Sequence, residues 1–345
     1  MAQEKILRVK NLEFFFRTYG GIVKSVRDVS FDIHEGEIVG IVGESGCGKS
    51  VTAQSILKLN PEPPGFFGEK SSIKFKGEEI VTKTDKEMRK IRGKDIGFIF
   101  QDPMTSLNPT MRIGKQIEEV LEGRKGYTKK QRKERTLEIL RLVGISDAEK
   151  RYRQYPHELS GGMKQRVMIA IALVGNPSII IADEPTTSLD VTIEAQILSL
   201  LKELQEKLHT AIIFITHDLG VIAKLCDRVM VMYGGKIVET GDVEDIYYHT
   251  AHPYTVGLMN SITRLELDRA TKLEPIEGTP PDLFSPPQGC PFAARCKYAM
   301  NICYRKPPEE YEVGEGHTCT CWLKDERSPK IELKTQLTQK EESYE

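Results

Sequence analysis

The feature that most constrains this 345-residue chain is an apolar strand that runs directly into a glycine-rich loop. Residues 37–42 are almost continuously apolar, and residues 43–50 read Gly-Glu-Ser-Gly-Cys-Gly-Lys-Ser, a GxxxxGK[ST] pattern. The glycines of such a loop leave backbone N–H groups free to converge on phosphate oxygens at a helix N-terminus, where the helix dipole favours anions. The order of strand, loop and helix therefore predicts an α/β core that binds a phosphate-bearing ligand.

Strands and helices alternate along much of the chain. Apolar runs at residues 96–100, 178–182 and 211–216 predict strands, whereas residues 160–174 and 193–208 have helical periodicity. This alternation predicts a mainly parallel sheet.

Other parts of the chain have a different texture. Alternating apolar and polar positions near the N-terminus predict an antiparallel β subdomain, and helical periodicity over residues 111–158 predicts an inserted helical subdomain. After residue 262, proline-rich segments predict a small, loop-rich, cysteine-containing region that buries little apolar surface. The predicted domains are residues 5–262, with the helical subdomain at about 102–160, then the C-terminal region 263–323 and a polar tail 324–345.

Acidic residues follow one of the apolar strands. Asp183 ends the strand and Glu184 comes next, which suits Mg²⁺ binding and activation of water, respectively. In the glycine-rich loop, Lys49 would reach the β- and γ-phosphates and Ser50 would bind Mg²⁺. These positions predict an NTP-hydrolysing site.

A second helix start carries exposed backbone donors. Ser160 suits an N-cap, and Gly161 and Gly162 follow it. By itself this is an ordinary helix start. Because residues 43–50 already hold one nucleotide, a second phosphate-binding helix start is useful if it serves the nucleotide of another subunit.

The complete set of motifs, in this order, resembles the ATP-binding subunits of ABC transporters over residues 5–323. The resemblance implies a P-loop NTPase (RecA-like) fold, ATP and Mg²⁺ as ligands, and a head-to-tail dimer in which Asp190 bridges two sites. It implies that Glu184 is the general base, that His217 contacts the γ-phosphate, and that Gln101 senses Mg²⁺ and moves the helical subdomain.

The nucleotide site that follows from motifs and resemblance includes an adenine contact. Tyr19 is the candidate to stack on adenine, with core packing as the alternative because three phenylalanines at residues 14–16 are close in sequence. The residues expected to contact nucleotide are Tyr19, Gly43, Ser45, Gly46, Cys47, Gly48, Lys49, Ser50, Val51, Ser160, Gly161, Gly162 and Asp190. Ser50, Gln101 and Asp183 are expected to hold Mg²⁺.

A narrower resemblance is to the ATPases of bacterial dipeptide and oligopeptide importers. It is carried by residues 43–52, 100–109, 252–255, 289–296 and 321–323. It implies a second ATPase subunit, identical or homologous, two membrane permeases, and indirect action with an extracytoplasmic solute-binding protein. The expected location is the cytoplasmic face of the cell membrane, as a peripheral subunit.

Five of the seven cysteines crowd into residues 290–321. Their spacing lacks the two-residue steps of a zinc ribbon or a bacterial ferredoxin and supports only four thiolates near each other. In the peptide-importer ATPases this region binds a [4Fe–4S] cluster, which implies Cys290, Cys296, Cys303 and a fourth ligand. The fourth is Cys319 or Cys321, and the Trp-Leu pair at residues 322–323 favours Cys321. We expect His317 at the surface and Cys226 in the core.

Composition and the missing repeats exclude some alternatives. With 49 basic and 50 acidic residues the net charge is −1, so no nucleic-acid partner is expected. A soluble ABC ATPase of translation or DNA repair would carry a second cassette or a long coiled coil, and neither pattern is present. The alternatives kept are a soluble ABC ATPase without a transport role, an ABC importer of another solute such as nickel or oligosaccharide, and a cluster-sensing regulatory ATPase.

Overall fold

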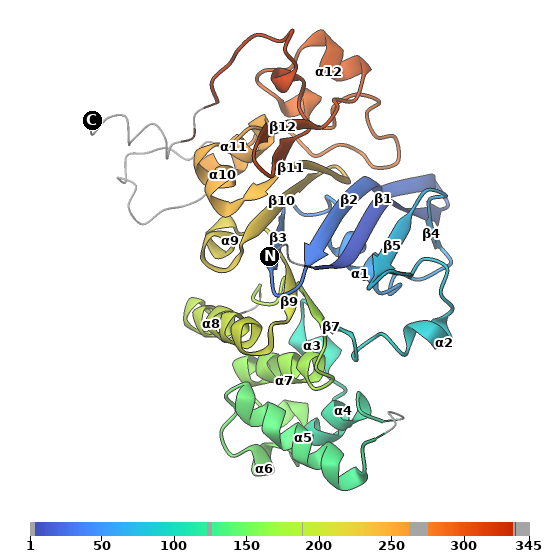
Figure 1. The fold of residues 1–345 in the computed structure, drawn as a ribbon, viewed down its shortest axis with the longest axis vertical. Coiled ribbons are helices and arrows are strands. Elements are labelled where there is room, and N and C mark those ends of the chain that lie inside the picture. The colour runs from blue at the N-terminus through green and yellow to red at the C-terminus, as the bar shows by residue number, and fades with distance from the viewer. Residues whose placement is uncertain (1–3, 123–125, 188, 262–274, 334, 336–345) are drawn as a thin grey trace, which may run out of the picture. The chain divides into compact units, whose positions relative to one another are not determined.

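The computed structural model of the chain divides into two compact units that interleave in sequence (Figure 1). The described residues are 4–122, 126–187, 189–261, 275–333 and 335. The first unit comprises residues 1–6, 33–38 and 82–215, and the second comprises residues 7–32, 39–81 and 216–345. The predicted boundary at residue 262 and the end of the predicted tail, from residue 336 on, lie outside the described residues.

The first unit is built on parallel strands. β7 (Ile96–Ile99) pairs with β8 (Ile179–Asp183), and β8 pairs with β9 (Ala211–Thr216). β8 and β9 are buried along their whole length, as expected of parallel strands covered on both faces. Because parallel strands end at the same edge of a sheet, the residues that follow β7 and β8 are brought together there.

Between β7 and β8 the chain forms a group of helices. Their bounds are α3 (Pro103–Ser106), α4 (Ile113–Glu119), α5 (Lys129–Leu142), α6 (Ala148–Arg151), the 3₁₀ turn η1 (Pro156–Glu158) and α7 (Gly161–Leu173). α3, α4 and α5 all contact α7, which is therefore the centre of the group (Figure 1). α5 begins with a capping box between Thr128 and Gln131. Two further helices of this unit are α2 (Asp85–Met88) and α8 (Val191–Leu208).

The second unit contains an antiparallel sheet near the N-terminus. Its strands are β1 (Lys5–Thr18), β2 (Gly21–His34), β4 (Gly65–Phe67), β5 (Ser72–Phe75) and β6 (Glu78–Glu79). The order is β2-β1-β5-β6, and β4 pairs with β1. Phe14 of β1 is fully buried and makes edge contacts with Phe16 and Phe67. Alternation of apolar and polar residues correctly predicted β1 and β2, whereas β4, β5 and β6 were not predicted.

A second group of strands in this unit carries the glycine-rich loop. β3 (Ile38–Val42) pairs in parallel with β10 (Arg228–Tyr233), and β10 forms an antiparallel hairpin with β11 (Lys236–Asp242). β13 (His317–Cys319) pairs with β11, and β12 (Tyr311–Gly314) pairs with β13. The C-terminal region therefore adds strands to the sheet that includes β3.

Helices of the second unit follow these strands. They are α1 (Lys49–Ile56), α9 (Leu219–Leu225), α10 (Val243–Tyr248), α11 (Pro253–Asn260), α12 (Asn301–Arg305) and the 3₁₀ turns η2 (Ala293–Arg295) and η3 (Trp322–Lys324).

The C-terminal region contributes more to the core than its sequence predicts. Phe292 is buried and its ring contacts Tyr233 and Tyr254. The expectation that His317 lies at the surface is wrong, because His317 is 2% exposed and its Nε2 is 2.9 Å from Oε1 of the buried Glu239. Neighbouring strands β11 and β13 bring these two side chains together, which local sequence does not reveal. Cys226 is buried, as predicted.

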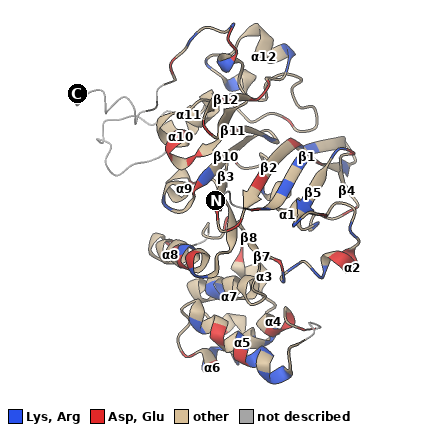
Figure 2. Ribbon diagram, in the orientation of Figure 1, with Lys and Arg blue, Asp and Glu red and all other residues tan. Residues whose placement is uncertain are grey.

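Charges of both signs are interspersed along the helices and strands (Figure 2). Among the described residues, none of the helices has the length and apolar character needed to cross a membrane.

Candidate functional site

The glycine-rich loop joins β3 to α1 in a conformation that its glycines permit. Gly46 and Gly48 have positive φ angles of 76° and 103°. A Cβ atom on Gly43 would lie 2.1 Å from the carbonyl oxygen of Met232, and one on Gly48 would lie 2.5 Å from that of Ser25. Two of the glycines are therefore required by close backbone approach as well as by the motif.

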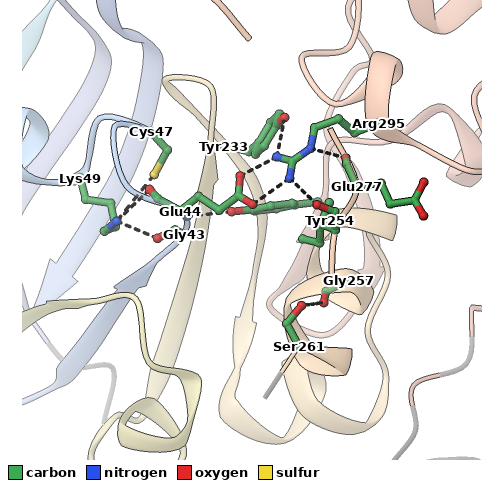
Figure 3. Close-up of polar contacts among 11 residues, drawn as sticks. Gly43, Glu44, Cys47, Lys49, Tyr233, Tyr254, Gly257, Ser261, Glu277 and Arg295 are labelled. Atoms are coloured by element: carbon green, nitrogen blue, oxygen red, sulfur yellow. Dashed lines mark hydrogen bonds and ion pairs between the residues drawn. The ribbon is translucent and has the colours of Figure 1, made fainter. Parts of the chain in front are cut away.

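Lys49 lies across the loop that precedes it. Its Nζ donates hydrogen bonds to the carbonyl oxygens of Gly43, at 2.7 Å, and Glu44, at 3.0 Å, and the residue is 5% exposed (Figure 3). Cys47 is buried in the same loop, and burial raises the pKa of its thiol. The loop thus holds a positive charge beside a ring of backbone groups, whereas Ser45 and Gly46 are exposed at its tip.

At the ends of β7 and β8, the first unit brings two predicted catalytic residues together. Nε2 of Gln101 donates a hydrogen bond of 2.9 Å to Oε2 of Glu184, and the hydroxyl of Thr187 donates to the same oxygen. Asp183 is 5% exposed at the end of β8. Asp183 and Glu184 are thus neighbours in the chain, but Asp183 is buried whereas the Glu184 carboxylate accepts hydrogen bonds from Gln101 and Thr187.

The backbone of Glu184 is held in an unusual conformation. Its φ is 45°, in the left-handed region that residues other than glycine seldom adopt, and its N–H donates to the carbonyl of Ile215. Such strain persists where the surrounding structure determines it, and it gathers at functional sites. The left-handed backbone of Glu184 and the hydrogen bonds to its carboxylate from Gln101 and Thr187 together mark it as a candidate functional residue.

The start of α7 has the geometry predicted for it. Ser160 is the N-cap and its hydroxyl oxygen accepts from the N–H of Met163. Gly161 is exposed with open space beside it, and a Cβ on Gly162 would touch Ile193. Asp190 caps α8 by accepting from the N–H of Ile193 and is itself exposed. Ser160, Gly161 and Asp190 are thus available to a second chain.

Tyr19 and His217 lie in the second unit. Tyr19 is fully exposed after β1, which excludes core packing and leaves adenine stacking as the prediction. His217 is exposed directly after β9. Ser50 is the second residue of α1, and Val51 follows it with a carbonyl that accepts from Ser55.

Two residues that sequence analysis did not assign to the site, Tyr254 and Arg295, hold the loop from the C-terminal side. The hydroxyl oxygen of Tyr254 accepts a 2.8 Å hydrogen bond from the N–H of Glu44. Arg295 contacts the Glu44 carboxylate with both terminal nitrogens, at 2.6 and 3.0 Å (Figure 3). The pKa of Arg295 is raised above its ordinary value, chiefly by the hydrogen bond to Glu44. The only signal in the sequence was that Tyr254 and Arg295 belong to the segments quoted for the peptide-importer resemblance.

The C-terminal cysteines are free thiols in different degrees of burial. Cys290, Cys303, Cys319 and Cys321 are buried, and Cys296 is half-buried. Burial raises the pKa of Cys290 to about 12, with smaller contributions from the charges of Cys321, Cys303 and Cys296. Within the described parts of the chain, no group of three or more His, Cys, Asp or Glu residues is placed to hold a single metal ion.

Cys319 and Cys321 form a hydrogen-bonded pair of thiols. Burial, followed by this hydrogen bond, raises the pKa of Cys319, whereas the hydrogen bond from Cys319 lowers the pKa of Cys321. Cys321 also influences the pKa of Cys296. The choice between Cys319 and Cys321 as the fourth ligand stays a prediction.

Comparisons with known proteins agree with this geometry. A family model described as ABC transporter matches residues 26–187, and one described as oligopeptide/dipeptide transporter, C-terminal region, matches residues 238–303. The chain is 55% identical to the oligopeptide transport ATP-binding protein OppD of Bacillus subtilis strain 168 over 328 residues, 95% of this chain and 91% of that protein. It is also 55% identical to the dipeptide transport ATP-binding protein DppD of the same strain, over 94% of this chain and 96% of that protein.

Solved structures give the same assignment. A dimeric, post-hydrolysis state of the ATP-binding cassette MJ0796, bound to ADP and Pi, matches with a TM-score of 0.61 and 30% identity, over 69% of this chain and 98% of that chain. The chain therefore belongs to the ABC transporter family, as an ATP-binding protein that carries the oligopeptide/dipeptide transporter C-terminal region.

Proposed function

We propose that this chain is the ATP-hydrolysing subunit that powers import of dipeptides or oligopeptides through a membrane ABC transporter. The observation that carries the proposal is the near full-length similarity to OppD and DppD, which includes the C-terminal region described for oligopeptide/dipeptide transporters. The names of these relatives favour a peptide over nickel or oligosaccharide, and transport over a soluble role in translation or DNA repair.

Hydrolysis is assigned to groups at the end of β8. Glu184 takes a proton from the attacking water, and its carboxylate is oriented for this by the strained backbone and by hydrogen bonds from Gln101 and Thr187. Gln101 thereby connects the base to the helices that follow β7. His217 contacts the γ-phosphate in this proposal.

ATP binding is assigned to the loop between β3 and α1. Backbone N–H groups of residues 43–50 bind the phosphates, and Lys49 moves from the loop carbonyls to the β- and γ-phosphate oxygens. Ser50, Gln101 and Asp183 supply a hydroxyl, an amide and a carboxylate oxygen, a donor set that suits Mg²⁺. Bound Mg²⁺ neutralises negative charge on the phosphates. Tyr19 stacks on adenine.

The exposed start of α7 and Asp190 are assigned to a second ATPase subunit, identical or homologous. Support comes from their exposure and from the dimeric state of the solved cassette MJ0796. Two membrane permeases bind the helical group α3 to α7 at the cytoplasmic face of the membrane, and an extracytoplasmic binding protein delivers the peptide.

We further propose that Cys290, Cys296, Cys303 and Cys321 ligate a [4Fe–4S] cluster. Four thiols within residues 290–321, three of them buried, are the donor set that such a cluster uses. The proposal concerns a cluster rather than a single ion, for which the described residues show no suitable group.

The transport proposal is tested by reconstitution. The chain would be co-expressed with two candidate permeases from the same genome, and uptake of radiolabelled dipeptide and tetrapeptide into proteoliposomes would be measured with ATP on the side of the ATPase. Uptake that requires ATP and vanishes with Lys49→Ala supports peptide import. ATP-dependent uptake of nickel or maltooligosaccharide without uptake of peptide would contradict it.

A further inference from the structure

The glycine-rich loop contains an acidic residue, Glu44, although its proposed ligand is a polyanion. An unpaired carboxylate close to bound phosphates would repel them, because like charges a few ångströms apart interact strongly outside bulk water. The side chain of Glu44 is only 26% exposed, so solvent screens it incompletely. The charge of Glu44 therefore needs a fixed partner.

Arg295 supplies that partner and is itself completely hydrogen-bonded. Besides the two bonds to Glu44, its Nη1 donates to the hydroxyl of Tyr233 at 3.2 Å, its Nη2 to the carbonyl of Ile276 at 3.0 Å, and its Nε to that of Glu277 at 2.9 Å. All five N–H groups of a guanidinium are then used. Figure 3 shows these contacts around the guanidinium, and the Arg295 side chain is 5% exposed. Such a group is held in one orientation and, through its bidentate contact, holds Glu44 as well.

The position of Arg295 is set by the cysteine-containing segment. It ends the 3₁₀ turn η2, next to Cys296 and three residues after Phe292. The Phe292 ring packs against Tyr254, whose hydroxyl accepts from the N–H of Glu44. The main chain and the side chain of Glu44 are thus both held by residues more than 200 positions later in the sequence.

We propose that Arg295 is a positioning residue for ATP binding: through its ion pair with Glu44 it holds the glycine-rich loop in the shape that receives the phosphates and neutralises the one acidic side chain of that loop. Arg295 itself does not touch the nucleotide. The inference rests on the proposed phosphate-binding role of residues 43–50. It also makes nucleotide affinity depend on the order of the segment that contains Cys290 and Cys296.

The ion pair predicts an asymmetry between its two members. Loss of Arg295 leaves the Glu44 carboxylate unpaired beside the phosphates and also frees the loop. Both effects weaken ATP binding. Loss of Glu44 frees the loop but also removes the repulsive charge. Once Glu44 is absent, further loss of Arg295 should change ATP affinity little, because the ion pair is already gone.

A double-mutant cycle on the full-length chain tests the proposal. The dissociation constant of the non-hydrolysable analogue AMP-PNP, with Mg²⁺, would be measured by titration calorimetry for wild type, Arg295→Gln, Glu44→Ala and the double variant. We expect rises of about tenfold for Arg295→Gln and about threefold for Glu44→Ala, and about threefold, not thirtyfold, for the double variant. Arg295→Lys keeps the charge without the bidentate geometry and should fall between wild type and Arg295→Gln.

Kinetics separate positioning from a general structural effect. Arg295→Gln should raise KM for ATP by about tenfold while kcat stays within about twofold, because Glu184 is untouched. Arg327→Gln is the matched control, since Arg327 pairs with Asp325 in the same C-terminal region but is exposed and makes no contact with the loop; it should bind as wild type.

Three results would overturn the proposal. These are wild-type affinity in Arg295→Gln, wild-type affinity in Glu44→Ala, or effects of the two substitutions that multiply in the double variant. If Arg295→Gln does not fold, as judged by circular dichroism, Glu44→Ala and Arg295→Lys still decide between these outcomes. Lys49→Ala distinguishes failure of the proposed phosphate site from failure of the role of Arg295. If Lys49→Ala binds AMP-PNP normally, the assignment of residues 43–50 as the phosphate site fails. If Lys49→Ala loses binding but Arg295→Gln binds normally, only the role of Arg295 is rejected.

Discussion

The glycine-rich loop and the start of α7 have similar sequences, because each brings glycines to the N-terminus of a helix, but they are supported differently. The loop is built into its unit: Gly43 and Gly48 are required by close backbone approach, and Glu44 is held by Arg295 and Tyr254. The start of α7 is exposed at Ser160 and Gly161, with open space beside Gly161. The two helix starts thus resemble each other in sequence and differ in how far the surrounding structure holds them, which fits the proposal that only the start of α7 serves a second chain.

The largest expected effect concerns the chemistry that both regions serve. Glu184→Gln keeps the shape of the side chain and removes the base, so ATP turnover should fall by about 10² or more while AMP-PNP binding persists. Turnover by the purified variant and its binding by calorimetry are the measurements. Asp102→Asn, at the cap of α3, is a control outside the proposed site and should hydrolyse ATP near the wild-type rate. Near-normal turnover in Glu184→Gln would show that another group activates the water.

A large charged side chain at the start of α7 tests directly whether the glycine-rich loop and the start of α7 have different roles. Ser160→Arg should abolish most ATP turnover, by about 10²-fold, while AMP-PNP binding to the single chain is nearly unchanged, because that site is complete without Ser160. Lys49→Ala should do the reverse and weaken binding itself.

Mixing the two variants sharpens this test. A dimer of one Lys49→Ala chain and one Ser160→Arg chain contains at most one intact composite site, so partial activity of the mixture above either pure variant would identify a site shared between chains. Normal hydrolysis by pure Ser160→Arg would contradict the shared site.

A third prediction concerns the cysteines behind the loop. Protein purified without air should be brown, absorb broadly near ~400 nm, and contain iron and sulfide in equal amounts. Substitution of Cys290, Cys296, Cys303 or Cys321 by Ser should each remove the cluster and expose residues 280–323 to protease, since metal binding and local folding are linked.

Matched variants in the same chain control for the loss of any thiol. Cys319→Ser, Cys47→Ser and Cys226→Ser should keep the iron. Stoichiometric zinc without iron would reject the cluster but keep the four-thiolate site. The phosphate loop itself contains none of these ligands, so AMP-PNP binding should survive in part, reduced to the extent that Arg295 loses its place.

The smallest expected effect is a pH dependence of the support behind the loop. His252 caps α11, with its Nδ1 accepting from the N–H of Tyr254, and burial lowers its pKa to about 3. The unfolded chain takes up the His252 proton near pH 6.5, but the folded chain does not, so stability is fully present above pH 6.5 and declines as the pH falls toward 3.

Replacement of His252 measures how much of the loss of stability at low pH comes from the titration of this side chain. His252→Asn retains a capping side chain and cannot titrate, so between pH 7 and pH 5 it should lose less stability than wild type, by on the order of 2 kcal/mol. Denaturant unfolding at both pH values measures the difference. Equal losses in both proteins would show that His252 takes up its proton without unfolding.

Features of the site that depend on residues close in sequence were predicted better than features that depend on contacts between distant residues. Ser160 as an N-cap and the strand that ends at Asp183 were predicted correctly, because capping and strand patterning depend on residues close in sequence. The hydrogen bond between Gln101 and Glu184 joins the ends of two paired strands 83 positions apart, and the motifs predicted both residues but not their contact. Tyr19 could not be assigned from sequence alone, because an aromatic residue beside a strand is equally suited to the core and to a ligand.

The C-terminal region shows where such reasoning stops. Proline-rich texture predicted loose loops, yet Phe292 packs on two tyrosines and His317 is buried against Glu239. These contacts are made across paired strands and between segments distant in sequence, and no local periodicity encodes them.

By itself the sequence determined the family, the α/β alternation, the phosphate-binding loop and its acidic partners, because each is a short pattern whose chemistry requires particular residue types at particular spacings. The tertiary structure alone decided that Arg295 neutralises Glu44, that Tyr19 is exposed, and that His317 is buried against Glu239. Burial and charge pairing depend on neighbours that folding brings together from distant parts of the chain. A sequence pattern does not show which distant residues become neighbours.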